Sequence, residues 1–284
     1  MQQRRLGDRT VSAIGLGGMP LSIEGRPDEA QAVRTVHAAL DAGVTLLDTA
    51  DAYCLGPDEV GHNERLLARA LSSWSGDRDA VLIATKGGHT RPPDGSWALD
   101  GSREHLRAAC EASLRALGVE SIGLYQYHRP DPQVPWAESV GALEELRQEG
   151  KVQLVGVSNA DPAQIREAAA VTPLAAVQNE LSPRFRSSEP EVDLCAELGV
   201  AFLPWSPLGG IGKAGGLGST HGAFAEVAAE RGVSPQQVCL AWLLAKSPVV
   251  IPIPGARRVE SIVDSVAAAQ LVLSDEELAR LEQS

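Results

Sequence analysis

The fold of this chain is decided by the stretch Val44-Thr45-Leu46-Leu47-Asp48-Thr49-Ala50-Asp51-Ala52-Tyr53. Its first four, mostly apolar positions run into a carboxylate, and a phenol follows five residues later. A short apolar run of this kind is typical of a strand buried on both faces. In a parallel β/α barrel, catalytic groups lie at the carboxyl ends of such strands. Asp48 and Tyr53 are therefore predicted to share one rim of a barrel.

Composition narrows the kind of protein to which this rim belongs. The chain has 284 residues, of which 44% are hydrophobic and 22% are charged, as in ordinary globular proteins. A formal net charge of -12 disfavours a nucleic-acid groove, because phosphate contacts need a basic face. No apolar run approaches the ~20 residues that span a bilayer, and residues 1–8 lack the apolar core of a signal peptide. We expect a cytoplasmic protein with neither a nucleic-acid nor a membrane partner.

Cysteine and histidine spacing gives no sign of a metal or a disulfide framework. The four cysteines, Cys54, Cys110, Cys195 and Cys239, lie far apart without a Cys-x-x-Cys pair. The six histidines, His37, His62, His89, His105, His128 and His221, lack zinc-ligand spacing. Reduced, mostly buried thiols and no bound metal are expected.

Apolar strand segments alternate with amphipathic helix segments along the whole chain. The spacing predicts strands at 13–16, 44–47, 80–85, 122–127, 152–157, 176–178, 200–205 and 249–251, each followed by a helix. A short N-terminal hairpin is predicted at residues 4–11, and extra helices are predicted late in the chain. This pattern favours a (β/α)8 TIM barrel over a doubly wound sheet. Because no low-complexity linker interrupts it, residues 1–284 are interpreted as a single domain.

Polar side chains follow three neighbouring strands of this predicted barrel. Asp48, Lys86 and His128 end the second, third and fourth strands, and Tyr53 lies on the loop after the second. An ammonium favours the phenolate form of a nearby tyrosine and lowers its pKa, while a carboxylate keeps that ammonium charged. A neutral imidazole can donate a hydrogen bond to a substrate oxygen. Such a set can protonate a carbonyl oxygen as negative charge grows there.

Structural interpretations of the same residues stay open. Asp48 and Lys86 can form a purely structural ion pair, Tyr53 can be a surface phenol, and His128 can be an ordinary buried histidine. Trp205 alone suits a core position, and Arg257 with Arg258 suits a solvated helix start. The placement of the first four residues at three adjacent strand ends favours catalysis.

Seven motifs at successive strand ends resemble those of the aldo-keto reductases, and the resemblance covers nearly the whole chain. They are Leu47-Asp48-Thr49-Ala50-Asp51-Ala52-Tyr53, Ala84-Thr85-Lys86, Tyr127-His128-Arg129-Pro130-Asp131, Gly156-Val157-Ser158-Asn159, Gln178-Asn179, Pro204-Trp205-Ser206-Pro207-Leu208-Gly209 and Ile253-Pro254-Gly255. The resemblance implies a barrel that binds a nicotinamide cofactor, usually NADPH, without a Rossmann fold. It also implies that Tyr53 is the general acid of carbonyl reduction, that Lys86 and Asp48 tune it, and that His128 orients the carbonyl.

The resemblance also implies where the cofactor binds. Ser158, Asn159 and Gln178 match the positions that hold the nicotinamide carboxamide, and Trp205 takes the place of the aromatic residue that stacks on the ring. Ser206, Leu208 and Gly210 resemble the loop that straps the pyrophosphate, with Lys213 as a charge partner. Gly255, Arg257 and Arg258 fall at the adenosine end, where two arginines suit a 2′-phosphate and hence NADPH over NADH. Gly17, Gly18 and Met19 either approach the nicotinamide side or form only a tight bend.

Two features depart from simple expectations. The family often has arginine and then asparagine further along the adenosine segment, where this chain has Ser261 and Ser265, so the adenine contacts differ here. The segment Gly210-Ile211-Gly212-Lys213-Ala214-Gly215 fits Gly-x-Gly-x-x-Gly, but no acidic residue ends a second strand about 20 residues later, as the dinucleotide fingerprint requires. We interpret it as a mobile strap over the cofactor.

The sequence therefore predicts an NADPH-dependent oxidoreductase that reduces the carbonyl of an aldehyde or ketone to an alcohol, with Tyr53 as the general acid; small aldehydes, aryl ketones, sugars and pyridoxal-like aldehydes all stay open as substrates. The alternative is an NADP(H)-sensing regulatory subunit with slow turnover. A different barrel enzyme, such as a phosphate-binding isomerase or hydrolase, is a third option. Loops after the fourth and seventh strands and the region 88–101, with Trp97, are expected to shape the substrate pocket.

Overall fold

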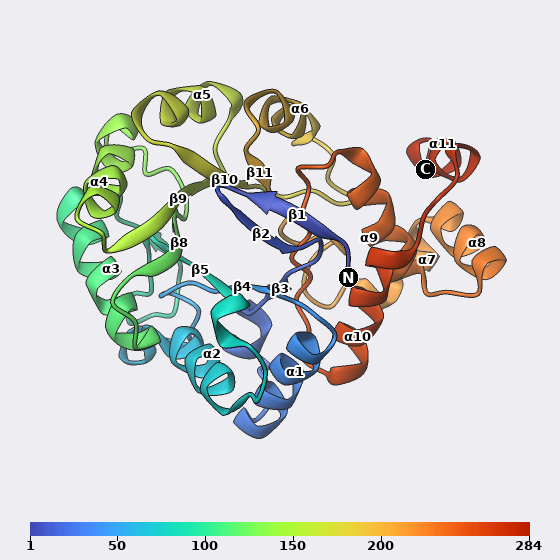
Figure 1. Cartoon of the computed structure of the whole chain (residues 1–284), viewed down its shortest axis with the longest axis horizontal. Coiled ribbons are helices and arrows are strands. Elements are labelled where there is room, and N and C mark those ends of the chain that lie inside the picture. Colours follow the sequence, from blue (N-terminus) through green and yellow to red (C-terminus); the bar gives the residue numbers. More distant parts are fainter.

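Short apolar segments form the inner ring of the protein, whose computed structural model describes residues 1–284 (Figure 1). Seven strands form one parallel sheet in the order β11-β10-β9-β8-β5-β4-β3. They are β3 (Leu16–Gly17), β4 (Leu46–Asp48), β5 (Leu82–Gly87), β8 (Ile122–Tyr127), β9 (Val152–Ser158), β10 (Leu174–Gln178) and β11 (Ala201–Phe202). Helices surround this ring, so the strands are covered on the outside as a parallel sheet requires.

An eighth segment closes the ring, although it is not a regular strand. This closing segment, residues 249–255, bridges in parallel to Phe202 on one side and to Gly17 on the other. Gly15 N–H donates to the carbonyl of Pro252, and Gly17 N–H donates to the carbonyl of Pro254. The predicted strand at 249–251 therefore occupies its expected place, but the two prolines lack N–H groups and cannot complete a ladder.

Helices fill the outer layer, and most begin and end at the residues that the sequence indicates. They are α1 (Glu29–Asp41), α2 (His62–Ser73), α3 (Arg103–Leu117), α4 (Trp136–Gln148), α5 (Pro162–Val171), α6 (Glu189–Leu198), α7 (Leu217–Thr220), α8 (Gly222–Arg231), α9 (Pro235–Lys246), α10 (Val259–Ala267) and α11 (Asp275–Glu282). Short 3₁₀ turns are η1 (Met19–Leu21), η2 (Pro57–Glu59), η3 (Arg78–Ala80), η4 (Ala214–Gly216) and η5 (Ala268–Gln270). A capping box starts α11: the Ser274 side chain accepts from the Glu277 N–H, and the Glu277 side chain accepts from the Ser274 N–H.

The amino-terminal end of the barrel is covered by a hairpin of β1 (Gln3–Leu6) and β2 (Arg9–Ser12), which crosses the ring in Figure 1. Leu6 and Val11 are buried and pack in one cluster with Leu46, Leu82 and Leu124 from the inner face of the strands. The hairpin therefore acts as a plug, and the carboxyl end of the barrel is left for chemistry. The four cysteines are all buried and unpaired, as predicted.

Several predicted boundaries were wrong, and one hairpin was missed. The predicted strands at 13–16, 80–85 and 200–205 correspond to β3, β5 and β11, and Ala80 instead ends the 3₁₀ turn η3. Residues 88–101 contain a two-stranded hairpin, β6 (His89–Thr90) with β7 (Ala98–Leu99). Each of these strands is only two residues long, too short for an alternating pattern to reveal it.

Candidate active site

Lys86 lies at the centre of the predicted catalytic group. It is the fifth residue of β5, its exposed fraction is 0%, and its Nζ donates to Asp48 Oδ2 at 2.7 Å and to the Thr49 carbonyl at 2.8 Å. Its third hydrogen bond goes to the Tyr53 hydroxyl at 3.1 Å. An ammonium has three donors, so all the donors of Lys86 are used. The structure thus brings Asp48, Tyr53 and Lys86 into direct contact.

The second oxygen of Asp48 is held by amides from other strands. Gln178 Nε2 donates to Asp48 Oδ1 at 2.8 Å, and Gln126 Nε2 contacts the same atom at 3.4 Å. Gln126 comes from β8 and Gln178 from β10, so four strands meet around one carboxylate. Sequence reasoning missed Gln126. Side chains alternate between the two faces of a strand, and Gln126, two residues after Leu124, points to the inner face of β8 as Leu124 does.

Burial and charge act in opposite directions on the two central groups. For Lys86, burial lowers the pKa, but the charges and hydrogen bonds of Asp48 and Tyr53 outweigh burial and leave the pKa above its ordinary value. For Tyr53, burial raises the pKa, and the opposing effect of Lys86 does not fully cancel it. The prediction that Lys86 brings the pKa of Tyr53 below its usual range was therefore wrong in net direction. The sequence indicates that the Lys86 ammonium is near Tyr53, but it does not show how completely Tyr53 is removed from water.

His128 lies beside Tyr53, just past the end of β8. The two ring centroids are 5.7 Å apart in an edge-to-face arrangement. Burial, then the charges of His89, Lys86 and Arg129, lowers the pKa of His128 well below its ordinary value. His128 is therefore neutral at neutral pH, in the form that can donate one ring N–H to a substrate oxygen.

The hairpin of β6 and β7 carries two aromatic rings beside the predicted catalytic group: Trp97, which was expected there, and His89, which was not. His89 stacks against His128 with centroids 4.1 Å apart, and burial first of all lowers the pKa of His89 to about 4. Trp97 lies 5.3 Å from His89 and 6.5 Å from Tyr53, again between ring centroids. The expected wall at 88–101 is thus an aromatic cover beside the Tyr53 and His128 rings. The signal for His89 was its position three residues after Lys86, on the same rim.

Asp48, Tyr53, Lys86 and His128 are called the tetrad from here on. The three residues predicted to hold a carboxamide lie next to it. Ser158 Oγ donates to the Gln178 carbonyl at 2.7 Å, and Asn159 Nδ2 donates to the His128 carbonyl at 3.0 Å. Asn159 has a φ of 58°, an uncommon conformation for a residue other than glycine. These contacts connect β8, β9 and β10 at their carboxyl ends and place amide and hydroxyl groups on one rim.

Trp205 and the loop after it form a more open part of the same rim. Trp205 is half-buried, packs against the inner apolar cluster, and has no hydrogen-bond partner for its buried Nε1. Ser206 follows with a φ of 50°, and Gly210 has a φ of 104°, so the chain turns sharply there. Leu208 is buried, whereas Lys213 is exposed and its side chain makes no hydrogen bond.

Gly17 and Gly18 close the barrel, and Met19 starts the 3₁₀ turn η1 behind them. A Cβ at Gly17 would lie 2.7 Å from the Ile253 carbonyl oxygen, and one at Gly18 would lie 2.8 Å from the Asp48 carbonyl oxygen. Gly18 N–H also donates to that Asp48 carbonyl at 2.7 Å. The close approach of neighbouring backbone explains why neither position carries a side chain, and contact of this segment with the nicotinamide stays a prediction.

The adenosine-end arginines differ sharply in their contacts. Arg257 Nε donates to the Pro20 carbonyl at 3.2 Å, and its Nη2 donates to the Glu24 carbonyl at 2.8 Å. Arg258 is exposed and its side chain makes no hydrogen bond within the chain. Gly255 is exposed, and a Cβ there would lie 2.6 Å from Pro20 Cγ. Arg257 therefore fastens the loop after β3, and Arg258 is the arginine left free.

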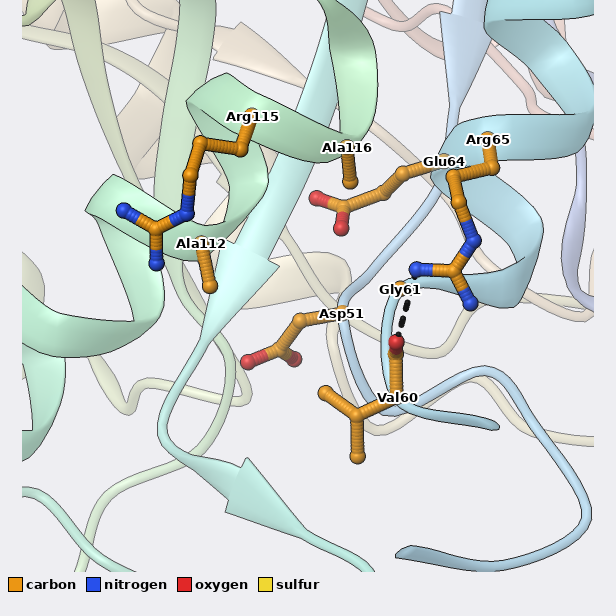
Figure 2. Close-up of a pocket in the computed structure, with 8 residues that line it drawn as sticks. All are labelled: Asp51, Val60, Gly61, Glu64, Arg65, Ala112, Arg115 and Ala116. Atoms are coloured by element: carbon orange, nitrogen blue, oxygen red, sulfur yellow. Dashed lines mark hydrogen bonds between the residues drawn. The ribbon is translucent and has the colours of Figure 1, made fainter. Parts of the chain in front are cut away.

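Asp51 belongs to the opening motif, but its carboxylate makes no hydrogen bond to Asp48, Tyr53, Lys86 or His128 and instead accepts from the Ala52 N–H at 2.6 Å. Figure 2 shows its carboxylate beside a separate cavity of about 340 Å³ that Glu64 and Arg65 of α2 and Arg115 of α3 also line. Arg65 is held by its hydrogen bond to the Val60 carbonyl at 3.0 Å. Burial, then the charge of Glu64, raises the pKa of Asp51 well above its ordinary value. The cavity thus contains a carboxyl group that resists ionisation.

A (β/α)8 barrel with a buried lysine, carboxylate and tyrosine at its carboxyl rim defines a class of barrel oxidoreductases, and comparisons with known proteins agree. A profile of the aldo/keto reductase family matches residues 13–284. The chain therefore belongs to the aldo-keto reductase family. An uncharacterized oxidoreductase, C215.11c, of Schizosaccharomyces pombe is 33% identical over 283 residues, which cover 98% of this chain and 88% of that protein.

Solved structures are similar along almost the full length. The glycerol dehydrogenase AKR11B4 of Gluconobacter oxydans is 28% identical, with a TM-score of 0.86 over 99% of this chain and 94% of that one. An aldo-keto reductase of Klebsiella pneumoniae in complex with NADPH is 29% identical, with a TM-score of 0.83 over 100% of this chain and 95% of that one.

No helix in the structure is long and apolar enough to cross a bilayer. No group of three or more metal-ligating side chains gathers anywhere in the chain.

Proposed function

We propose that this protein is an NADPH-dependent oxidoreductase that reduces the carbonyl of an aldehyde or ketone, with Tyr53 as the general acid. The observation that carries the proposal is the hydrogen bond from Lys86 Nζ to the Tyr53 hydroxyl at 3.1 Å, with Asp48 at 2.7 Å on the same ammonium. A buried phenol in contact with a buried ammonium is arranged to release a proton as negative charge grows on a nearby oxygen.

The rim around the tetrad fits a nicotinamide dinucleotide. Trp205 has an unpartnered buried indole N–H, Ser158 and Asn159 offer hydroxyl and amide groups at the end of β9, and the Arg258 side chain is free for a phosphate. Relatives from Klebsiella pneumoniae have been crystallised with NADP and with NADPH, which supports the same cofactor here. When bound, the cofactor supplies the hydride that reduces the carbonyl carbon.

The chain's own residues handle the proton. Tyr53 is protonated at neutral pH because burial raises its pKa, so it starts the reaction as an acid. Lys86 stabilises the phenolate that remains after proton transfer, and Asp48 keeps Lys86 charged and directed. Neutral His128 and the Trp97 ring flank the phenol, so that a carbonyl group is oriented toward the Tyr53 hydroxyl.

The experiment is a comparison of Tyr53→Phe with the wild-type protein. NADPH fluorescence titration is expected to give similar affinity for both, while the reductase rate on a panel of aldehydes and ketones falls at least ~1000-fold. Tyr125→Phe is a matched control, because Tyr125 is also buried but donates to the Leu106 carbonyl at 3.2 Å, away from the tetrad. A Tyr53→Phe enzyme with most of its rate would remove Tyr53 from the acid role.

The NADP(H)-sensing alternative has no specific observation in its favour, because the tetrad is complete and fully connected. Tight NADPH binding with negligible turnover across the whole carbonyl panel, together with a stable partner protein, would support that alternative. Absence of NADPH binding would instead indicate a different barrel enzyme.

A further inference from the structure

Arg91, just past β6, is a buried cation with unused hydrogen-bonding capacity. Its side chain is 1% exposed, and its Nη2 reaches only Glu24 Oε1 and the Leu55 carbonyl, both at 3.3 Å. Its Nε is buried without any hydrogen-bond partner. A guanidinium has five N–H donors, and burying them without good acceptors is unfavourable. The existing contacts therefore leave donors free for a further acceptor.

The carboxylate nearest to Arg91 is a weak partner. The Glu24 side chain is 69% exposed, so water screens its charge and competes for its oxygens. In the other direction, the Arg91 guanidinium carbon lies 4.2 Å from the Trp97 ring, where a cation is attracted by the aromatic face. This stacking fixes the guanidinium plane but satisfies none of its in-plane donors. Arg91 is thus held in place and still able to bind an anion.

Arg91 lies close to the reacting group. The Trp97 ring that stacks on Arg91 at 4.2 Å is also 6.5 Å from the Tyr53 ring. Because both distances are measured to the Trp97 ring, the Arg91 guanidinium carbon lies no more than about 11 Å from the centre of the Tyr53 ring. A small molecule of about that length, with its carbonyl oxygen at the Tyr53 hydroxyl, can reach Arg91 with its other end. The neighbouring His89 is neutral, because burial lowers its pKa to about 4, so Arg91 supplies the positive charge on this hairpin.

We infer that Arg91 is a specificity-determining residue for carbonyl substrates that carry an anionic group, a carboxylate or a phosphate, a few bonds from the carbonyl. The inference rests on the proposed carbonyl reduction and names the substrate class for it. A guanidinium binds such groups through two parallel hydrogen bonds, which matches the free donors of Arg91. Trp97 covers the chain between the carbonyl and the anion.

The test compares matched substrates with and without the anion. The wild-type holoenzyme is expected to reduce para-carboxybenzaldehyde with at least ~10-fold higher kcat/KM than para-methylbenzaldehyde. In Arg91→Gln, kcat/KM for the acid falls about 10- to 100-fold, which is the range for a charge-assisted pair, while the neutral aldehyde changes by less than ~3-fold. Glyceraldehyde phosphate against glyceraldehyde forms the second arm and tells a phosphate site from a carboxylate site.

Two further variants separate recognition from a merely structural role. Arg91→Lys keeps the charge without the planar fork and is expected to lose less of the acid preference than Arg91→Gln. Glu24→Gln removes the competing carboxylate and is expected to raise kcat/KM for the acid without changing the neutral aldehyde. A purely structural Arg91, which only ties the hairpin to Glu24 and Leu55, predicts equal losses on both substrates.

Several outcomes would overturn the inference. They are a wild-type enzyme that does not prefer the anionic member of either pair, or an Arg91→Gln enzyme that loses both members equally. If no carbonyl compound is turned over, the proposed function fails by itself. Calorimetric titration of the NADP-loaded protein with para-carboxybenzyl alcohol and para-methylbenzyl alcohol then decides about Arg91, because equal affinities for the two alcohols contradict an anion site.

Discussion

Lys86 and the loop after β11 lie on the same rim but have opposite surroundings. Lys86 is completely buried, and its three hydrogen bonds go to Asp48, Thr49 and Tyr53. Lys213, in the loop, is exposed and its ammonium makes no hydrogen bond, although its backbone N–H donates to the Gly210 carbonyl at 3.1 Å. The loop also turns through left-handed residues, Ser206 at a φ of 50° and Gly210 at 104°.

The contrast between a fully hydrogen-bonded Lys86 and an exposed Lys213 matches two different requirements, one for proton transfer and one for cofactor binding. Proton transfer needs an acid whose pKa and direction are fixed before the substrate arrives. A long cofactor instead needs a segment that adapts and releases it, and segments with few internal bonds open at low free-energy cost. The lysine in each region gives a direct test of this interpretation.

Replacing Lys86 should have the largest effect. Lys86→Met leaves Asp48 buried without its counter-charge, so we expect a loss of roughly 3–5 kcal/mol in the free energy of unfolding. The reductase kcat/KM should fall by at least ~1000-fold, because the phenolate loses its stabilising charge. Lys213→Met is the matched control, with stability within about 0.5 kcal/mol of wild type and at most a weaker affinity for NADPH. Similar kinetic losses in the two variants would contradict the division between the regions.

The two arginines at the adenosine end sharpen the comparison within the cofactor region. Arg258→Ala should weaken NADPH binding about 10- to 100-fold and leave NADH within ~3-fold, because only NADPH carries the 2′-phosphate. Arg257→Ala frees the loop at Pro20 and Glu24 and should weaken both cofactors alike. Fluorescence titration with both nucleotides measures these effects. The 2′-phosphate assignment of Arg258 would be wrong if that variant lost both cofactors equally.

A smaller effect is expected behind the tetrad, at Asp51. Because burial raises the pKa of Asp51 in the folded state, the native protein binds a proton that the unfolded chain releases above about pH 4. Stability from this group is therefore present at low pH and is lost as the pH rises. Asp51→Asn should raise Tm at pH 7 by ~2–4 °C, and the difference should shrink toward pH 4. A variant that is less stable than wild type at pH 7 contradicts this account.

The smallest effect concerns His128. Burial, followed by His89, Lys86 and Arg129, lowers its pKa well below 6.5, so His128 does not take up a proton near neutral pH. The kcat/KM for a neutral aldehyde should change by less than ~2-fold between about pH 6 and pH 8. A pH profile with a half-loss near 6.5 would show that His128 ionises as an ordinary histidine and that its surroundings are wetter than the structure has them.

Sequence patterns predicted most of the barrel because the strand and helix signals are local. The predicted strand at 122–127 matches β8 at both ends, since its apolar run is bounded by clear turn residues. The contact between Lys86 and Tyr53 also followed from the rule that strand ends meet at one rim.

What could not be predicted depends on burial and on distant backbone. The pKa of Tyr53 is raised because burial outweighs the ammonium, and no sequence pattern measures desolvation. Arg257 and Arg258 are adjacent and look equivalent, yet only Arg257 reaches the carbonyls of Pro20 and Glu24, more than 200 positions away. Arg91 drew no attention because a single arginine in a polar loop is usually solvated.

The closing segment, residues 249–255, also affects how the protein behaves during folding, before the ring of strands is complete. Its Ile251 and Ile253 N–H groups donate toward β11, while Pro252 and Pro254 present no donor to the side that faces β3. Until β3 pairs with the closing segment, the side of this segment that faces β3 is an exposed edge of the sheet. Exposed edges can pair with strands of other molecules. The two prolines make it a poor template for a foreign strand. An incomplete barrel of this protein is thus protected from strand-to-strand aggregation at the edge formed by the closing segment.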